Sequence, residues 1–266
     1  MENGLSVGLI GGCQSVSDAG LRRRVVARVA RGVGRTVWVV PRDEQMLRWF
    51  SIVRVANVQT VRWVLGALNG WTVPVSSRQA QSWCSRMRTA GLVDSVQLGG
   101  SGGAVVWATY AGVGQAKPDL YRQTTRHEIA VAAVSARYAA AGYAWQRDDK
   151  APVTGAHQAD GVALAVGWVE LVEVELTAKR MPRYASIFEA YRRRLEFGDG
   201  DQVTYLCNAD AARAVRAALR SLPAGQAIAA RVSVREVFDA AGLWAGEELP
   251  DWLPTARERA PQLVSR

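Results

Sequence analysis

The chain has few residues of the kinds that build disulfide-rich, zinc-binding or membrane-spanning proteins. Its 266 residues include three cysteines, Cys13, Cys84 and Cys207, an odd number spaced too far apart for a disulfide framework or a zinc pattern. No apolar run approaches the ~20 residues of a membrane span. The N-terminal charges follow the apolar stretch, the reverse of a signal peptide. We therefore expect a protein of the reducing cytoplasm with no membrane partner.

Histidines and phosphate-loop glycine patterns are also scarce. The two histidines, His127 and His157, stand alone in the sequence, and two isolated histidines rarely make a metal site. His157 precedes Asp160 by three residues and could act as a general base, but the interpretation favoured here gives it no role. Gly32-Val-Gly-Arg and Gly99-Gly-Ser-Gly-Gly lack the spacing and the following Lys-Ser/Thr of a phosphate loop. We expect no organic cofactor.

Lysine is missing from the first 116 residues, where every basic side chain is Arg. Residues 1–40 carry six Arg against two acids and residues 41–116 carry seven against three, whereas residues 117–266 carry twenty Lys or Arg against nineteen acids. Arg forks match phosphates and guanine edges. The distribution favours a nucleic-acid partner, although a basic, Arg-rich proteome would give the same surplus.

Residues 37–116 have the pattern of three helices followed by a hairpin. The predicted helices run from Pro41 to about Val53, from the N-cap candidate Asn57 onward, and from Ser76 or Ser77 to Ala90. Two strands then flank a glycine-rich tip. This order is that of a winged helix-turn-helix, in which the third helix enters the major groove and the tip forms the wing.

The candidate DNA contacts are polar side chains of the helices and of a basic, partly flexible arm at residues 1–36. Leu21 to Ala30 could be a short helix of that arm, either tracking the DNA backbone or simply solvated. The candidates are Arg78, Gln81, Ser82, Ser85, Arg86 and Arg88 in the third helix, Arg62 in the second, and Arg22, Arg23 and Arg24 in the arm.

The second half alternates helices and strands. The predicted elements are a helix at 127–141, strands at 143–147, 160–166 and 169–176, a helix at 183–196, a strand at 203–207, a helix at 209–222 and a strand at 227–232. The order αβββαβ is that of a PD-(D/E)XK restriction-endonuclease-like core. The predicted fold class is therefore α/β (α+β), with two domains and a C-terminal extension. Their bounds are 37–116 for the winged helix, 122–232 for the nuclease-like domain and 233–266 for the extension.

Acidic residues gather in two neighbouring apolar segments of this half. Asp160 opens one predicted strand, and Glu173 and Glu175 lie two apart in the next. Strand side chains alternate faces, so these two glutamates share a face that Asp160 can also share. Crowded carboxylates repel one another, and a hard cation such as Mg²⁺ or Mn²⁺ would relieve that cost. The pattern is the one that a metal-dependent nuclease needs.

Several segments together resemble the replication-relaxation family of actinobacterial plasmids and phages. The match covers roughly residues 37–222 and is of moderate specificity, since no single motif is diagnostic. It implies a winged helix followed by a nuclease-like domain, and a DNA-binding role in a mobile element. The segments are Pro41-Arg-Asp-Glu-Gln-Met-Leu-Arg-Trp, Trp107-Ala-Thr-Tyr-Ala-Gly, Arg126-His-Glu-Ile-Ala-Val, Gln158-Ala-Asp-Gly, Glu173-Val-Glu-Leu-Thr-Ala-Lys, Arg183-Tyr with Tyr191, and Val203-Thr-Tyr-Leu-Cys.

The nuclease pattern assigns roles to five residues. Asp160, Glu173 and Lys179 are the predicted catalytic residues, and Asp160, Glu173, Glu175 and Glu128 are the predicted ligands of Mg²⁺ or Mn²⁺. Glu175 stands where the pattern has lysine, and Lys179 lies four residues further on. The metal would lower the pKa of a bound water, and Lys179 would steady the developing charge. The alternative is a vestigial set of acids kept as a salt-bridged sheet face.

The expected function is double-stranded DNA binding in replication, mobilisation or DNA relaxation, with Mg-dependent nicking as an added activity. The protein would associate with the nucleoid or a plasmid, as a homodimer or with a replication or mobilisation protein. A transcriptional regulator with an inactive nuclease-like domain is the alternative, and an interaction scaffold without DNA is a third reading.

Overall fold

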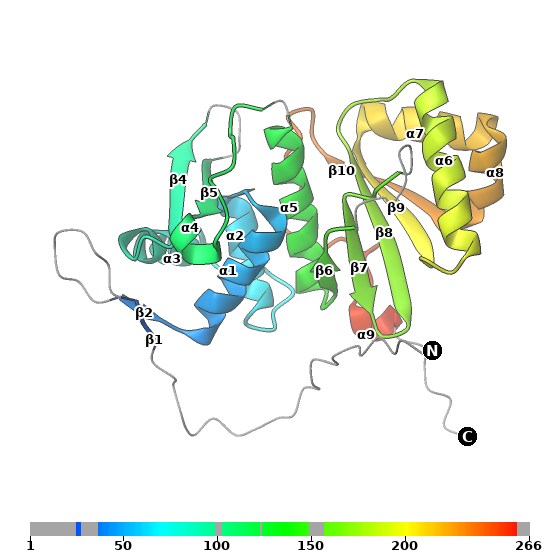
Figure 1. The fold of residues 1–266 in the computed structure, drawn as a ribbon. Helices are drawn as coiled ribbons and strands as arrows, with labels where there is room; N and C mark the ends of the chain where they lie inside the picture. Colours follow the sequence, from blue (N-terminus) through cyan, green and yellow to red (C-terminus); the bar gives the residue numbers. More distant parts are fainter. Residues whose placement is uncertain (1–24, 28–36, 99–102, 123, 149–156, 260–266) are drawn as a thin grey trace, which may run out of the picture.

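The computed structural model describes residues 25–27, 37–98, 103–122, 124–148 and 157–259 of this mixed α/β protein (Figure 1). In these ranges the strands form three sheets of two, five and three strands. No helix in the same ranges is long and apolar enough to span a membrane. The predicted contacts Arg22, Arg23 and Arg24 and the glycine-rich tip at 99–102 lie outside the described residues.

In the described residues, the first half consists of three longer helices, one short helix and a small three-stranded antiparallel sheet. The sequence signals place the helix starts: Pro41 is the first residue of α1, the Asn57 side chain accepts a hydrogen bond from Thr60 N (2.8 Å), and Ser76 caps α3. The sheet has the order β3-β5-β4. The elements are α1 (Pro41–Val53), β3 (Ala56–Asn57), α2 (Val58–Ala67), α3 (Ser77–Thr89), β4 (Val93–Gln97), β5 (Ala104–Ala108) and α4 (Tyr110–Val113).

A short antiparallel pair precedes these helices. Strand β1 (Val25–Ala27) pairs with β2 (Val37–Val39), so the helix predicted over 21–30 is wrong at its centre. Both segments are valine-rich, and β-branched residues favour an extended backbone once a partner strand is present. The periodicity of the sequence could not reveal that partner.

The second half is built on a five-stranded mixed sheet of order β10-β9-β8-β7-β6. Strands β6, β7 and β8 form an antiparallel meander, after which β9 and β10 run parallel to β8. The observed order from α5 to β9 is αβββαβ. The elements are α5 (Thr125–Ala140), β6 (Ala144–Gln146), β7 (Gly161–Ala165), β8 (Trp168–Glu175), α6 (Met181–Glu196), β9 (Gln202–Asn208) and α7 (Ala209–Ser221), with α8, β10 and α9 following.

The strand predicted at 227–232 is wrong. Pro223 begins α8 (Pro223–Ile228), a 3₁₀ turn follows, and β10 covers Val232–Phe238. Proline in the first turn and an alanine-rich run both favour helix. Strand β10 therefore comes from the predicted C-terminal extension, whose last described element is α9 (Ala256–Arg259).

Helix α5 lies between the helices of the first half and the sheet of the second (Figure 1). Ala136 packs in the core of α1, α2 and α3, whereas Val134 packs in the core of the sheet. The Trp49 indole of α1 donates a hydrogen bond to Ser135 Oγ (2.7 Å) in the buried junction. Small side chains on α5 let the helices approach closely, so the two halves share buried surface.

Candidate functional site

The exposed face of α3 collects five of the predicted DNA contacts. The opposite face of the helix is buried in the core of the first half, which fixes the direction of the outward side chains. The α3 face, as we call it, consists of Arg78, Gln81, Ser82, Ser85 and Arg88, all exposed. The helix contains no Asp or Glu, so the face carries only positive and neutral polar groups.

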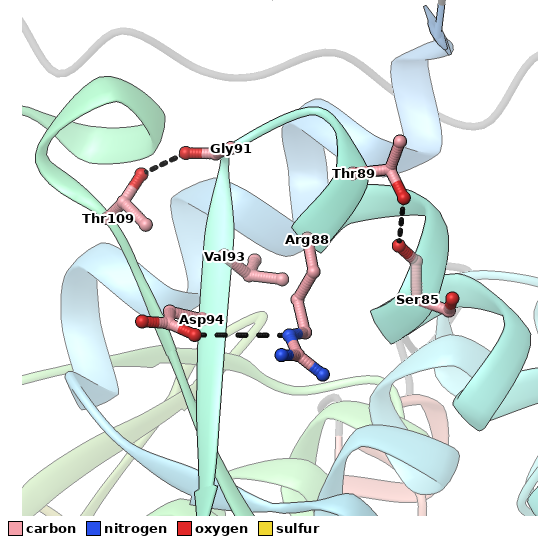
Figure 2. Close-up of a pocket in the computed structure, with 7 residues that line it drawn as sticks. All are labelled: Ser85, Arg88, Thr89, Gly91, Val93, Asp94 and Thr109. Atoms are coloured by element: carbon pink, nitrogen blue, oxygen red, sulfur yellow. Dashed lines mark hydrogen bonds and ion pairs between the residues drawn. The ribbon is translucent and has the colours of Figure 1, made fainter. Parts of the chain in front are cut away.

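A depression of about 540 Å³ continues the α3 face between the end of the helix and strand β4 (Figure 2). Its lining includes Ser85, Thr89 and Thr109. The Arg88 side chain extends toward Asp94, with 3.9 Å between Nε and Oδ1. Both side chains are more than half exposed, and an ion pair this long and solvated contributes little. Arg88 can therefore turn to another anion at low cost.

Arg86, also predicted as a DNA contact, does not belong to that face and is engaged within the protein. Its guanidinium binds Asp43 of α1 in a bidentate pair (2.6 and 2.8 Å) and also donates to Trp38 O. Burial alone would raise the pKa of Asp43, but the hydrogen bonds from Arg86, Val40 N and Trp83 outweigh it and lower that pKa. Arg86 thus ties α3 to α1.

Arg62 is likewise engaged within the protein. Its side chain is only 12% exposed, and Nε donates to Val75 O (2.9 Å). Its outer nitrogens meet Gln59 and Glu247. Arg62 therefore connects α2 to residues 239–259, which we call the C-terminal segment, and its charge is engaged within the protein.

Asp160 lies at the start of β7, where its carboxylate is held by the next strand and by α5. Oδ2 accepts a hydrogen bond from Val174 N (2.8 Å) and lies 3.2 Å from His127 Nε2. Burial acts to lower the pKa of His127, but the hydrogen bond and charge of Asp160 outweigh it, and the net pKa is raised. His127 and Asp160 form an ion pair when the imidazole is protonated.

Glu173 is buried in β8 and has two hydrogen-bond partners of its own. The Tyr191 hydroxyl of α6 and His157 Nε2 both contact Oε1. Burial raises the pKa of Glu173, the His157 hydrogen bond opposes this, and the charge of Asp160 raises it further. Asp160 and Glu173 therefore lie close enough for their charges to interact.

Both histidines of the chain contact a predicted catalytic acid, which the sequence interpretation missed. His127 comes from α5 and His157 from the segment before β7, and neither spacing reveals its partner. The position of His157 three residues before Asp160 was the one available signal. It pointed to the wrong acid, because the bond is to Glu173 on the adjacent strand.

Lys179 and the two remaining acids form separate pairs. Lys179 binds Glu175, and Glu128 of α5 binds Arg147. Burial lowers the pKa of Lys179, although the charges of Glu173 and Asp160 act in the opposite direction. The direct partner of Lys179 is Glu175, which occupies the lysine position of the nuclease pattern.

The four predicted metal ligands are each held by a proton donor of the protein. Within the described ranges, no group of three His, Cys, Asp or Glu side chains is placed to hold a metal ion. A cation would have to displace His127, His157 or Lys179 from its carboxylate, because a hard metal needs several oxygen ligands at once. As arranged, each of the four acids has its own protein partner, and we call these four pairs together the acidic network.

Comparison with known proteins returned no match, whether against protein-family models, curated proteins or solved structures.

Proposed function

We propose that this chain is a double-stranded DNA-binding protein of a mobile element, acting in replication, mobilisation or DNA relaxation. In this proposal residues 37–116 are a winged helix whose α3 enters the major groove, with β4 and β5 as the wing. The observation that carries the proposal is the α3 face, which presents arginine, glutamine and serine to solvent without any acid. Arginine and glutamine can read base edges, and serine can contact phosphate.

The second half is proposed to be a nuclease-like domain that works beside this DNA contact. The order αβββαβ and the placing of Asp160 and Glu173 near Lys179 support this assignment, as does the resemblance to the replication-relaxation family. Nicking with Mg²⁺ or Mn²⁺ remains part of the proposal. Nucleoid or plasmid association follows from DNA binding itself.

A transcriptional regulator with an inactive nuclease-like domain is the second candidate. The specific observation in its favour is that all four predicted ligands already have protein partners. Stable internal pairs are what an acidic network retains when it no longer binds a metal. The DNA contact through α3 is common to both candidates.

Duplex binding tests the shared part of the proposal. Affinity of the full chain for a short duplex, measured by fluorescence anisotropy between about 50 and 200 mM salt, should fall steeply. The double substitution Arg78→Ala/Arg88→Ala should weaken binding about tenfold and lower the salt slope by about two. The matched control, Arg213→Ala/Arg220→Ala, removes equal charge from α7. Equal affinity of the α3 variant and the wild type, or no binding at low salt, contradicts the proposal.

A plasmid assay separates the two candidates. Supercoiled plasmid is incubated with the protein and Mg²⁺ or Mn²⁺, alongside Asp160→Asn and Glu173→Gln, which keep the side-chain shapes inside the network. Relaxed plasmid with the wild type and intact plasmid with both variants supports the nuclease. Intact plasmid in every lane, with duplex binding retained, supports the regulator.

A further inference from the structure

A second cavity, of about 580 Å³, lies where the two halves of the molecule meet. The end of α1, the segment leading into α5 and Arg147 after β6 line it, and we call it the junction pocket. Four cations and two acids stand in its walls. They are Arg54, Lys117, Arg122 and Arg147, against Asp119 and Glu128.

Each of the two acids of the junction pocket forms an ion pair with one cation, so two cations have no acidic partner there. Arg122 pairs with Asp119 (3.2 Å), and Arg147 pairs with Glu128. Arg54 instead donates to two neutral oxygens, of the Gln115 side chain (2.7 Å) and the Ala116 carbonyl (2.9 Å). Arg54 makes no ion pair with any carboxylate in the described ranges. Its charge is therefore uncompensated within the pocket.

Lys117 is the second uncompensated cation. Its Nζ lies 4.9 Å from the centre of the Trp107 ring, a cation–π contact that orients the ammonium without neutralising it. The side chain is otherwise exposed and pairs with no carboxylate among the residues whose structure is described. An anion entering the pocket would meet Arg54 and Lys117 as free charges.

The rest of the lining is part apolar and part hydroxyl, which suits a group larger than an isolated phosphate. Ile52, Val55 and Leu120 form the apolar part, and Ser51, Thr124 and Thr125 supply hydroxyls. The cavity volume falls within the range of about 300–1,000 Å³ that small-molecule sites occupy. Arg147 also donates toward the Asp160 carbonyl (3.4 Å), so the pocket borders the acidic network. A nucleotide combines an anionic phosphate with a sugar and a base, so cations beside an apolar wall match its chemistry.

We propose that the junction pocket binds one nucleotide, with Arg54 and Lys117 holding its phosphate and the wall of Ile52, Val55 and Leu120 covering its base or sugar. The nucleotide comes from a nucleic-acid strand or is free in solution, since both present the same chemistry. The site is separate from the α3 face and does not depend on duplex binding there.

The test is a calorimetric titration of the full chain with thymidine 5′-monophosphate, and with thymidine as the probe that lacks the phosphate. The substitution Arg54→Gln/Lys117→Gln removes the two pocket cations that make no ion pair in the described ranges, and Lys117→Gln alone, at an exposed side chain, is the second variant should the double substitution impair folding. We expect the nucleotide to bind the wild type and to bind the double variant about tenfold or more weakly. Arg213→Ala/Arg220→Ala on α7 serves as the charge-matched control and should bind as the wild type does.

Competition identifies the source of the nucleotide. If a single-stranded oligonucleotide displaces the mononucleotide, and the pocket variant weakens both, the pocket holds a nucleic-acid strand; if the oligonucleotide does not compete, it holds a free nucleotide. Three results would overturn the proposal: no binding of the mononucleotide at low salt, equal binding of thymidine, or equal weakening in the α7 control. The Arg78→Ala/Arg88→Ala variant should keep full nucleotide affinity, so failure at either site is seen separately.

Discussion

At the scale of single residues, intramolecular partners decide which arginines of α3 are free to bind a partner. Arg78, Arg86 and Arg88 occupy one helix and look alike in sequence, yet only Arg86 has a buried carboxylate within reach. A charge that satisfies a fully buried Asp43 is held in place, because releasing it would leave an unpaired ion in the core. Arg86 is therefore a stability residue, whereas Arg78 and Arg88 are binding candidates.

Replacing Arg86 with alanine should destabilise the fold. We expect Arg86→Ala to lower the free energy of unfolding by about 3 kcal/mol, since Asp43 keeps only Trp83 and Val40 N as donors. Urea unfolding followed by circular dichroism measures this. Arg78→Ala is the control and should change stability by less than about 0.5 kcal/mol. Equal stability of the two variants would contradict the assigned role.

The Arg86–Asp43 pair also makes the stability of the fold depend on pH. The folded pKa of Asp43 is depressed below its usual value of 3.8, so its stabilising contribution is full above that value and is lost as the pH falls through the folded pKa. The stability gap between wild type and Arg86→Ala should thus be wide near neutral pH and narrow in acid. Thermal melts from neutral pH to below the usual carboxyl pKa follow the gap, and a gap that widens in acid would refute this account.

At the scale of elements, β7 and β8 position the acidic network. Gly161, the first residue of β7 and the neighbour of Asp160, packs tightly against β6. A Cβ added at Gly161 would lie 2.0 Å from Trp145 Cζ2 of β6. Trp145 is itself buried, so the ring has little room to yield. The glycine therefore lets β6 and β7 pair closely next to the candidate site.

Gly161→Ala should accordingly destabilise the sheet by about 1–3 kcal/mol through overpacking. The double substitution Gly161→Ala/Trp145→Phe should recover part of that loss, because the smaller ring makes room and removes a buried indole N–H that has no partner in the described structure. Unfolding free energies of the two single variants and the double variant form the test. Additive losses would show that the ring is not what the added methyl meets.

At the scale of the whole molecule, α5 and the C-terminal segment join the two halves. Arg137 of α5 stacks between Trp63 of α2 and Trp244 of the C-terminal segment, at 4.6 and 4.7 Å from the two ring centres. Burial lowers the pKa of Arg137 to about 9, while the charge of Glu247 raises it. The guanidinium nevertheless stays charged at neutral pH, and the two aromatic faces replace part of its lost hydration.

Truncation tests this connection. A chain ending at Asp239 loses Trp244 and Leu253, which pack in the core around α5. We expect a loss of about 5 kcal/mol, comparable with the whole stability of a small protein. Thermal melts should show both halves unfolding together at a much lower temperature, whereas a chain ending at Arg259 should melt like the full chain. Unchanged melting of the shorter chain would mean that the segment is an appendage.

Local signals in the sequence determined most of the elements. Apolar periodicity with caps at Asn57 and Ser76 fixed the helices of the first half, and alternation placed Glu173 and Glu175 on one face of a strand. These signals succeed because they depend on neighbours within a few residues. The predictions for β1 and for residues 223–238 were wrong, because an apolar pattern does not by itself fix the backbone conformation. A pairing strand made β1 extended, and a helix-forming context made residues 223–228 helical.

Only the tertiary structure decided what each polar side chain does. It set His127 beside Asp160 and His157 beside Glu173, and it paired Arg86 with Asp43. Such partners lie on elements distant in sequence, and the free energy of a charge depends on burial and on groups a few ångströms away. The sequence by itself supplied the charged residues and their order, whereas the packing of α5 against both halves determined which of them meet.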